Sequence, residues 1–383
     1  MKARDAVAVL GAAGAMGRAV VFDLARQGRR VRALDSDPAA LRRVVRRHGG
    51  TNTTAVALDA SDAAALGRGI HGAAVLVNCA PYRLNLPVMR AALDAGCHYV
   101  DLGGLFHVTR EQLRLDADFR RARRLALLGM GSAPGITNVL ARAAAAGLRR
   151  VTSIRVCNGG LDRTRHTAPL AFGFSPATVL DELTQDAMVF ERGRFAARPA
   201  RSGGEDFAFE IGVQRVHLSL HSEVATLPLT FAGRGLRECT FKIAYDPALL
   251  ERLGLLIDLG LADPRPGPRG VAPREVLLDA FRRLPPPPEV VDDVDSLAVV
   301  VEGEDARGPC RRRYDLTAVA QRRPPLSAVA RDTGFPPAIA AGFLLDGRLR
   351  ARGVHPPETC VPVAPFLREL ARRGLAPRLS RDR

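Results

Sequence analysis

The sequence predicts an α/β protein with a doubly wound parallel sheet, followed by a second α+β domain with a mixed sheet. Three observations lead to this prediction. A glycine-rich turn links a strand to a helix near the N-terminus, strands and helices then alternate to about residue 130, and strand-like segments dominate beyond about residue 150. The length of 383 residues suits two domains, which we place at 1–130 and 131–330.

The first turn follows the apolar run 6–10 and carries Gly11, Gly14 and Gly17. Small residues at this spacing let the backbone approach a pyrophosphate, which the positive end of the following helix attracts. The next strand ends at Asp35, where a carboxylate accepts hydrogen bonds from the adenosine ribose. The pattern therefore predicts a Rossmann-type dinucleotide site.

Cofactor choice depends on the charge near that ribose. Asp35 would repel a 2′-phosphate and favours NAD over NADP. Arg42 and Arg43 follow on the next predicted helix, where they either neutralise such a phosphate or are solvated charges. We expect NAD, with NADP as the alternative.

Further strands at 54–59, 73–78, 98–101 and about 124–128 alternate with helices at 86–97 and 109–123. Loops after parallel strands open on the ligand side of the sheet. The cofactor contacts expected from these loops and the first turn are Gly11, Gly14, Ala15, Met16, Gly17, Asp35, Asp59, Ala60, Asn78, Cys79, Ala80 and Pro81.

A second glycine-rich turn, GMGSAPG at 129–135, follows the sixth strand and runs into a helix. It opens on the same sheet edge as the first turn, so we assign it to the substrate pocket and to the hinge between the domains. The substrate contacts expected at this edge are Gly103, Gly104, Ala133, Pro134 and Gly135.

The second domain is predicted from strand-like runs at 151–160, 215–224 and 239–246 and a hairpin at 296–320. Helices are predicted at 176–188 and 274–284. Proline-rich loops are predicted at 264–273 and 284–289.

Seven motifs occur in order along almost the whole chain: GAAGAMG (11–17), VNCAPY (77–82), YVDLGG (99–104), GSAPGITN (131–138), HSEVATLP (221–228) and the segments 333–358 and 366–374. Together they resemble the saccharopine dehydrogenase-like family, most closely lysine 6-dehydrogenase and saccharopine reductase-like oxidoreductases. Two departures from the saccharopine reductase pattern are Ala133, where those enzymes carry an acidic residue, and Leu102-Gly103, where they carry Ser-Tyr.

The resemblance implies oxidation of an amine, or reduction of an imine, by hydride transfer to or from a nicotinamide cofactor. It also implies that 331–383 return to the first domain and that the second domain's sheet covers the pocket and mediates a homodimer. Such chemistry needs a neutral amine, a group that handles its proton, and no metal.

The candidate proton-handling residues are Asp101, His107 and Tyr82. Asp101 ends the fifth strand and faces the pocket edge, unless it caps or braces a loop. His107 lies in the following loop and titrates in the useful range, although a surface histidine is the common outcome. Tyr82 adjoins the Asn78–Pro81 turn and either contacts the nicotinamide or packs in the core.

The second domain offers four further candidates for substrate binding. His221 and Glu223 belong to the densest polar group of a strand-like run, and Glu223 suits a substrate ammonium. Arg163 and Arg165 suit a substrate carboxylate or are solvated loop charges. His217 and His221 lie four apart, but no third ligand follows at a telling spacing, so no metal site is expected.

Three functions remain open at this level. The leading one is oxidation of an amine of an amino acid such as lysine, or of a polyamine-like substrate. The second is reductive condensation of an amino acid with an aldehyde, of the saccharopine reductase or carboxynorspermidine dehydrogenase type. The third is dinucleotide binding without catalysis, because a fold alone never secures activity.

The composition of the chain limits the classes of partner and the compartment that we expect. The net charge of +16 comes from arginines spread along the chain rather than gathered in one stripe, so nucleic acid is not expected as a partner. No apolar run reaches the roughly 18 residues that a membrane span needs, and no signal peptide is evident, which favours a cytoplasmic protein. The six cysteines form no CxxC pair and are expected to be free thiols.

Overall fold

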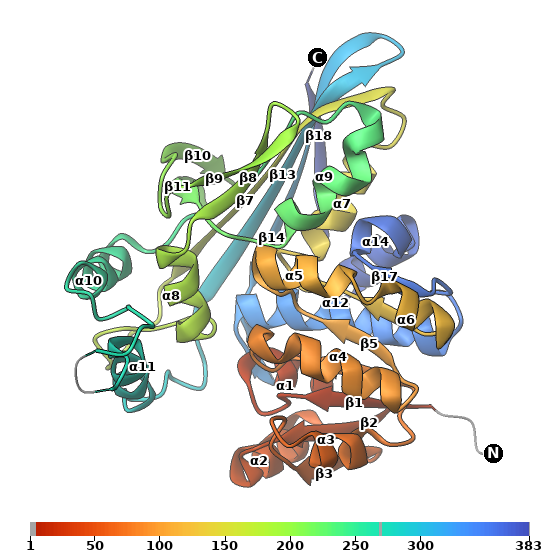
Figure 1. The fold of residues 1–383 in the computed structure, drawn as a ribbon, viewed down its shortest axis with the longest axis vertical. Helices are drawn as coiled ribbons and strands as arrows, with labels where there is room; N and C mark the ends of the chain where they lie inside the picture. Colours follow the sequence, from red (N-terminus) through yellow and green to blue (C-terminus); the bar gives the residue numbers. More distant parts are fainter. Residues whose placement is uncertain (1–4, 268–269, 383) are drawn as a thin grey trace.

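The computed structural model describes residues 5–267 and 270–382, which form two large sheets and a short two-stranded one (Figure 1). The extreme N-terminus, residues 1–4, on which the expectation of no signal peptide partly rests, lies outside these ranges. The predicted fold class is confirmed: a parallel Rossmann-like sheet is joined to a second domain with a mixed sheet.

The first sheet is parallel, and its described strands have the order β17-β6-β5-β4-β1-β2-β3. The strand order reverses between β1 and β4, and in open α/β sheets ligands bind at the carboxyl ends of strands at such a reversal. The strands are β1 (Ala6–Leu10), β2 (Arg30–Asp35), β3 (Thr53–Ala57), β4 (Val75–Asn78), β5 (His98–Asp101), β6 (Leu125–Leu127) and β17 (Gly353–His355).

Both faces of this sheet are covered, which explains why β1 is apolar at every position. Val7 and Val9 are buried in the core that includes helices α1 and α12, whereas Ala8 and Leu10 belong to the core under α3 and α4. The helices of this part are α1 (Ala15–Arg26), α2 (Pro38–His48), α3 (Ala63–Ile70), α4 (Asn85–Asp94), α5 (Leu105–Leu113), α6 (Asp116–Arg121) and α12 (Ala328–Leu345), with a 3₁₀ turn η1 (Tyr82–Leu84).

The C-terminal part of the chain joins the first sheet. Helix α12 packs along α1, and β17 pairs in parallel with β6 through Gly353 and Leu125. Figure 1 shows the blue C-terminal helices beside the red and orange N-terminal ones. Two shorter helices, α13 (Pro357–Cys360) and α14 (Val363–Arg372), complete this return before β18 (Arg378–Asp382).

The second sheet is mixed, with the order β10-β11-β12-β7-β13-β14-β18 among the described strands. In addition, β8 pairs with β12, and β9 pairs with β8. Its long central strands rise away from the first domain in Figure 1. The strands are β7 (Arg150–Asp162), β8 (Ala187–Glu191), β9 (Arg194–Arg198), β10 (Glu205–Phe209), β11 (Gly212–Leu218), β12 (Glu238–Ile243), β13 (Asp293–Asp305) and β14 (Gly308–Val319).

Helices α7 and α9 pack on this sheet, and α8, α10 and α11 form a separate apolar cluster at its side. The strands β15 (Gln321–Arg322) and β16 (Pro325–Leu326) form the two-stranded sheet just before α12. The helices are α7 (Ile136–Ala144), α8 (Pro176–Thr184), α9 (Glu223–Phe231), α10 (Pro247–Asp258) and α11 (Pro273–Arg282), with a 3₁₀ turn η2 (Ala232–Arg234).

Four predicted elements differ from the structure. Residues 223–224, expected at the end of the strand 215–224, begin helix α9, which tolerates Pro228 in its interior. The helix expected at 176–188 ends at Thr184, and strand β8 begins at Ala187. The helix expected at 109–123 is divided into α5 and α6. The third strand ends at Ala57 rather than at Asp59, and the last bond of its ladder is donated by the Leu58 amide to the Asp35 carbonyl oxygen.

Two further observations concern the described residues. No helix in them combines the length and the apolar character required to cross a bilayer. All six cysteines lie in the described ranges and are free thiols, with Cys97, Cys157 and Cys239 buried.

Candidate functional site

The first glycine turn lies at the carboxyl end of β1 and leads directly into α1. Gly14 is the N-cap of α1 and has no side chain to cap the helix, so the first-turn amides at Ala15, Met16 and Gly17 point to the space in front of it. A Cβ at Gly17 would lie 2.0 Å from the Gly11 carbonyl oxygen, so the turn closes only around glycine. These free amides and the positive helix end fit a pyrophosphate.

Asp35, at the end of β2, is fixed beside this turn. Its Oδ2 accepts a hydrogen bond from the Ala13 amide at 2.8 Å, and its Oδ1 accepts one from the Asp37 amide at 3.1 Å. Asp37 in turn caps α2 through the amides of Ala39 and Ala40. Asp35 therefore lies next to the predicted phosphate site, and its role toward a ribose stays a prediction.

The loop after β4 contacts the first turn. Gly11 has a φ of +73°, and a Cβ there would lie 2.8 Å from the backbone of Cys79. Asn78 is buried and shapes this loop, because its Oδ1 accepts from the Ala80 amide and its Nδ2 donates to Asn85 and Tyr99. The structure therefore brings the 78–81 loop and the first turn together.

The predicted adenine-side residues lie in a surface loop. Asp59 is exposed and its carboxylate accepts from the Ser61 amide at 2.8 Å, while Ala60 is half-buried. Both follow β3, beside β2 and Asp35. Their assignment to the cofactor stays a prediction.

The second glycine turn bonds mostly to itself and to Asp101. The Gly131 amide donates to the Pro134 carbonyl, and the amides of Ile136 and Thr137 donate to the carbonyls of Gly131 and Ser132. This turn therefore has few amides left for a phosphate.

The residues predicted to contact substrate at this edge pack on one another. A Cβ at Gly103 would lie 3.0 Å from the Pro134 ring and 3.2 Å from Ser222 Oγ, and a Cβ at Gly135 would lie 2.2 Å from the Gly131 carbonyl oxygen. The Gly104 amide donates to Ser222 Oγ at 3.2 Å. Gly104, Pro134 and Gly135 are buried, and Ala133 is half-buried.

Asp101 braces two loops, which is the alternative that the sequence left open, and its acid-base role stays a prediction. It is fully buried, and its carboxylate accepts from the amides of Gly103 and Gly129 and from Gln112 Nε2, at 3.0, 2.6 and 2.6 Å. Burial raises its pKa, and these hydrogen bonds oppose that shift. With its oxygens engaged, Asp101 joins the loop after β5 to the second glycine turn.

His107 and Tyr82 also differ from their predicted settings. His107 is exposed on helix α5, not in a loop, and its ring meets Phe106 edge-on. Tyr82 is half-buried and donates to Asp181 at 2.8 Å, which Arg83 and Arg274 also contact. Tyr82 therefore joins the loop after β4 to helix α8 of the second domain.

A buried polar cluster lies beside that link and was only half predicted. His221 stacks on Phe241 with ring centroids 3.7 Å apart, and its Nδ1 contacts Glu223. Thr137 donates to the other oxygen of Glu223 at 2.9 Å, and Tyr245 donates to Glu182. We call His221, Glu223, Glu182, Tyr245 and Thr137 the histidine cluster.

Burial and neighbouring charges shift the pKa values of two groups in the histidine cluster. Burial raises the pKa of Glu182 to about 7, against the opposing charge of His221. Burial lowers the pKa of His221, but Glu223 and Glu182 outweigh it and the net pKa is raised. Glu182 therefore changes charge near neutral pH, where an acid-base group acts on an amine, and His221 holds its proton more tightly than a free imidazole.

The sequence did not point to Glu182, to Tyr245 or to the buried pair of Asp295 and Asp332. Glu182 follows the buried Leu180 on α8 and is itself buried, so a carboxylate on an apolar helix face was the available signal. Asp295 and Asp332 are both buried near Ser132, and burial and then the charge of Asp295 raise the pKa of Asp332 well above its usual range.

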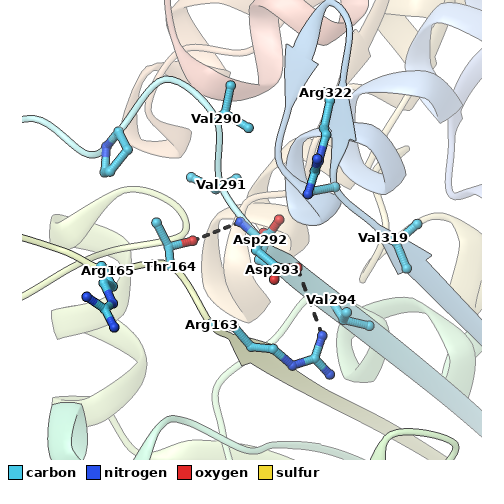
Figure 2. Close-up of a pocket in the computed structure, with 12 residues that line it drawn as sticks. Arg163, Thr164, Arg165, Val290, Val291, Asp292, Asp293, Val294, Val319 and Arg322 are labelled. Carbon is cyan, nitrogen blue, oxygen red and sulfur yellow. Dashed lines mark hydrogen bonds and ion pairs between the residues drawn. The ribbon is translucent and has the colours of Figure 1, made fainter.

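The two predicted arginines lie elsewhere. Arg163 and Arg165 line a pocket of about 420 Å³ at the end of β7, not the histidine cluster (Figure 2). His217 lies on β11, and His221 lies beyond the end of that strand. Among residues 5–267 and 270–382, no group of three or more His, Cys, Asp or Glu could hold a metal ion.

Comparison with known proteins identifies the family. The saccharopine dehydrogenase NADP binding domain matches residues 7–127, and the saccharopine dehydrogenase C-terminal domain matches residues 131–375. The chain is 26% identical over 325 residues to a carboxyaminopropylagmatine dehydrogenase from Synechocystis sp., covering 79% of each protein.

The fold agrees with a solved member. Apo saccharopine dehydrogenase (L-Glu forming) from Saccharomyces cerevisiae superimposes with a TM-score of 0.76 at 18% identity, over 99% of this chain and 100% of that one. The dinucleotide-binding geometry of the first turn fits this assignment. The chain therefore belongs to the saccharopine dehydrogenase family and is an NAD(P)-binding oxidoreductase of that family.

Proposed function

We propose that the protein interconverts a secondary amine that carries an amino-acid portion and the corresponding imine, using NAD or NADP. The observation that supports this most is the histidine cluster, where His221 lies between two buried carboxylates. The 26% identical relative is named for a dehydrogenase of a carboxyaminopropyl amine, which favours the condensing type over oxidation of a primary amine such as that of lysine.

The cluster lies next to the carboxyl edge of the first sheet. Ser222, between His221 and Glu223, accepts from the Gly104 amide and donates to the Leu105 carbonyl, so the start of α9 is held over the loop after β5. Tyr82 and Asp181 hold α8, and with it Glu182, over the loop after β4. Both contacts bring the cluster to the side on which a nicotinamide would lie.

When bound, the cofactor accepts a hydride from the carbon next to the substrate nitrogen, or donates one in reverse. The chain supplies proton handling at that nitrogen. Because Glu223 accepts from Nδ1 of His221, the free Nε2 is left to gain or lose a proton. In oxidation the ammonium loses one proton to Glu182 or His221, the C–H hydride leaves, a C=N bond forms, and water then cleaves it to amine and carbonyl.

We propose NAD as the preferred cofactor because Asp35 is held beside the ribose position by the Ala13 amide. Arg42 and Arg43 on α2 are the competing feature, since they could neutralise a 2′-phosphate. Titrations of the protein with NAD and with NADP decide between them, and tighter binding of NADP would contradict the preference. The homodimer suggested by the resemblance is a further proposal, which sedimentation checks.

The test is a rate measurement in both directions. Amines paired with oxo acids or aldehydes are assayed for reductive coupling, and C-deuterated secondary amines and L-lysine for deuteride transfer to the cofactor. Turnover of coupled pairs supports the proposal. Turnover of L-lysine alone supports primary-amine oxidation, and cofactor binding without any turnover supports a non-catalytic protein.

The variant E182Q sharpens this test. We expect kcat to fall by about 100-fold with the dinucleotide Kd unchanged, because general acid-base groups contribute at least this much. In the oxidative direction the wild-type rate should rise as Glu182 ionises, with a midpoint near its pKa of about 7, and E182Q should lose that rise. The control E251Q changes an exposed glutamate on α10. A wild-type rate and pH profile in E182Q would contradict the role.

A further inference from the structure

A second group of buried polar side chains adjoins the histidine cluster, and its centre is Glu358 on the short helix α13. Glu358 is 2% exposed. Its Oε2 accepts from Asn138 Nδ2 at 2.8 Å, and its Oε1 accepts from the Thr230 hydroxyl at 3.2 Å. The Thr226 hydroxyl accepts from Asn138 Nδ2 at 3.3 Å and also contacts Glu358. Parts of α7, α9 and α13 that are far apart in the sequence therefore meet at one carboxylate.

This carboxylate is held by hydrogen bonds and not by a cation. In residues 5–267 and 270–382, no Lys, Arg or His forms an ion pair with Glu358. Burial raises its pKa, and the hydrogen bonds that it accepts oppose that shift. Keeping a carboxylate in such a place costs free energy, and a neutral side chain of the same shape would join these helices at a lower cost. The charge therefore points to a role beyond holding the fold together.

An ionised carboxylate has no proton to donate, so it fixes the direction of each hydrogen bond that it makes. Asn138 must present its NH₂ group to Glu358. Its Oδ1 is then left to accept from the Gly135 amide at 3.0 Å, and it lies 3.5 Å from Thr137 Oγ1. If the amide of Asn138 were turned over, two donors would face each other at Gly135. Glu358 therefore sets which end of the Asn138 amide faces the start of α7.

Thr137 connects this arrangement to the reacting histidine. Its hydroxyl hydrogen has two acceptors within reach, Glu223 Oε1 at 2.9 Å and Asn138 Oδ1 at 3.5 Å, and the shorter bond is the stronger one. That bond holds one oxygen of Glu223, whose other oxygen contacts Nδ1 of His221. A continuous path of side chains thus leads from Glu358 through Asn138, Thr137 and Glu223 to His221.

We propose that Glu358 is a positioning residue for His221. Acting through the three side chains between them, it keeps the proton of the neutral imidazole on Nδ1 and leaves Nε2 free for the substrate nitrogen, because the hydrogen bond of one ring nitrogen decides the state of the other. This inference rests on the proposed function and deepens it, since it names a residue outside the histidine cluster that controls where His221 exchanges its proton.

The test is ¹⁵N NMR of the full-length protein, in which the imidazole signals report which ring nitrogen carries the proton. The signals of His221 are those that disappear in H221Q. At a pH where its imidazole is neutral, we expect the wild type to carry the proton on Nδ1. E358M fills a similar space without a strong acceptor, so the ratio of the Nε2–H form to the Nδ1–H form should rise about tenfold, as for the loss of one hydrogen bond. An unchanged ratio in folded E358M would overturn the proposal.

Two matched variants separate the hydrogen bond from other effects of the substitution. E358Q still offers an oxygen to Asn138 and should keep the wild-type spectrum. The control E251Q changes an exposed glutamate on α10 and should also keep it. A spectrum of E358Q that matches E358M would contradict the idea that an acceptor at this position is what matters.

The path itself is tested by a double-mutant cycle. T137V should raise the Nε2–H form as E358M does, and the double variant T137V/E358M should raise it no further, because both substitutions interrupt one path. Additive effects of the two substitutions would show that Glu358 does not act through Thr137.

A reversal of the hydrogen bond serves where E358M does not fold. N138D keeps an acceptor for the Gly135 amide but places a second carboxylate against Glu358, and it should raise the Nε2–H form. N138D/E358Q restores a donor and an acceptor with their places exchanged, and it should recover the wild-type spectrum. A wild-type spectrum in N138D alone would overturn the proposal.

Turnover gives a separate readout. E358M should lower kcat about tenfold and leave the Kd for NAD unchanged, because the first glycine turn is distant from this path in the chain and bonds to none of its members. The NMR experiment needs no substrate. A changed proton position with wild-type kcat would therefore refute the use of His221 in turnover, whereas an unchanged proton position would refute its positioning by Glu358.

Discussion

The two glycine turns look alike in sequence and differ in what their amides do. The first turn, 11–17, leaves the amides of Ala15, Met16 and Gly17 at a helix end without a cap. The second turn, 129–135, donates its amides to Asp101, to Pro134 and to Asn138. A glycine motif therefore indicates a tight turn, and only the hydrogen bonds show whether the turn is left open for an anion or closed on itself.

The largest effect is expected at the second turn. Gly135 has a φ of +128°, and an added Cβ would lie 2.2 Å from a backbone oxygen, so G135A should lower the free energy of unfolding by about 3 kcal/mol or more. Urea unfolding with and without NAD measures this. If G135A keeps wild-type stability and loses only ligand binding, the second turn is a ligand site. The proposed difference between the two glycine turns would then be wrong.

A smaller loss is expected at the brace of the second turn. In D101N an amide NH₂ replaces one acceptor that faces the Gly129 amide or Gln112, so we expect a loss of about 2 kcal/mol in the free energy of unfolding. The unfolding curve is compared with kcat for the same variant. If D101N is as stable as the wild type and its kcat is 100-fold lower, Asp101 acts as an acid-base residue.

The smallest change in stability is expected at the first turn. Gly14 has φ −67° and ψ 168°, which alanine adopts easily, and its Cβ would meet only the Gly11 oxygen at 3.3 Å. G14A should therefore change the free energy of unfolding by less than about 0.5 kcal/mol. Because the methyl group faces the phosphate position, the Kd for NAD should rise about tenfold. An unchanged Kd, measured by titration, would contradict the anion site.

The sequence predicted the parts of the fold that depend on local patterns. The first sheet, the turn at Gly11 and the hairpin at 296–320 follow from alternation, glycine spacing and apolar runs. Residues 223–224 were placed in a strand because the preceding alternation at Val216, Leu218 and Leu220 favours one, whereas packing of α9 against α5 and β12 decides for a helix.

The candidate site was harder to predict because its members are distant in sequence. Glu182, His221 and Tyr245 meet only once α8, α9 and β12 are packed, and a single carboxylate such as Glu182 carries no local signature of burial. Asp101 shows the converse. Its place at a strand end suggested chemistry, yet the neighbouring amides of Gly103 and Gly129 use its oxygens for structure.

The late strand β17 has a consequence for synthesis of the protein. Residues 353–355 cover the open edge of β6, so the first sheet cannot be completed until residue 355 has left the ribosome. Until then β6 presents an unpaired parallel edge that can recruit another nascent strand. A gene fragment ending at residue 330 is therefore a poor source of the isolated dinucleotide module, and such a product should aggregate.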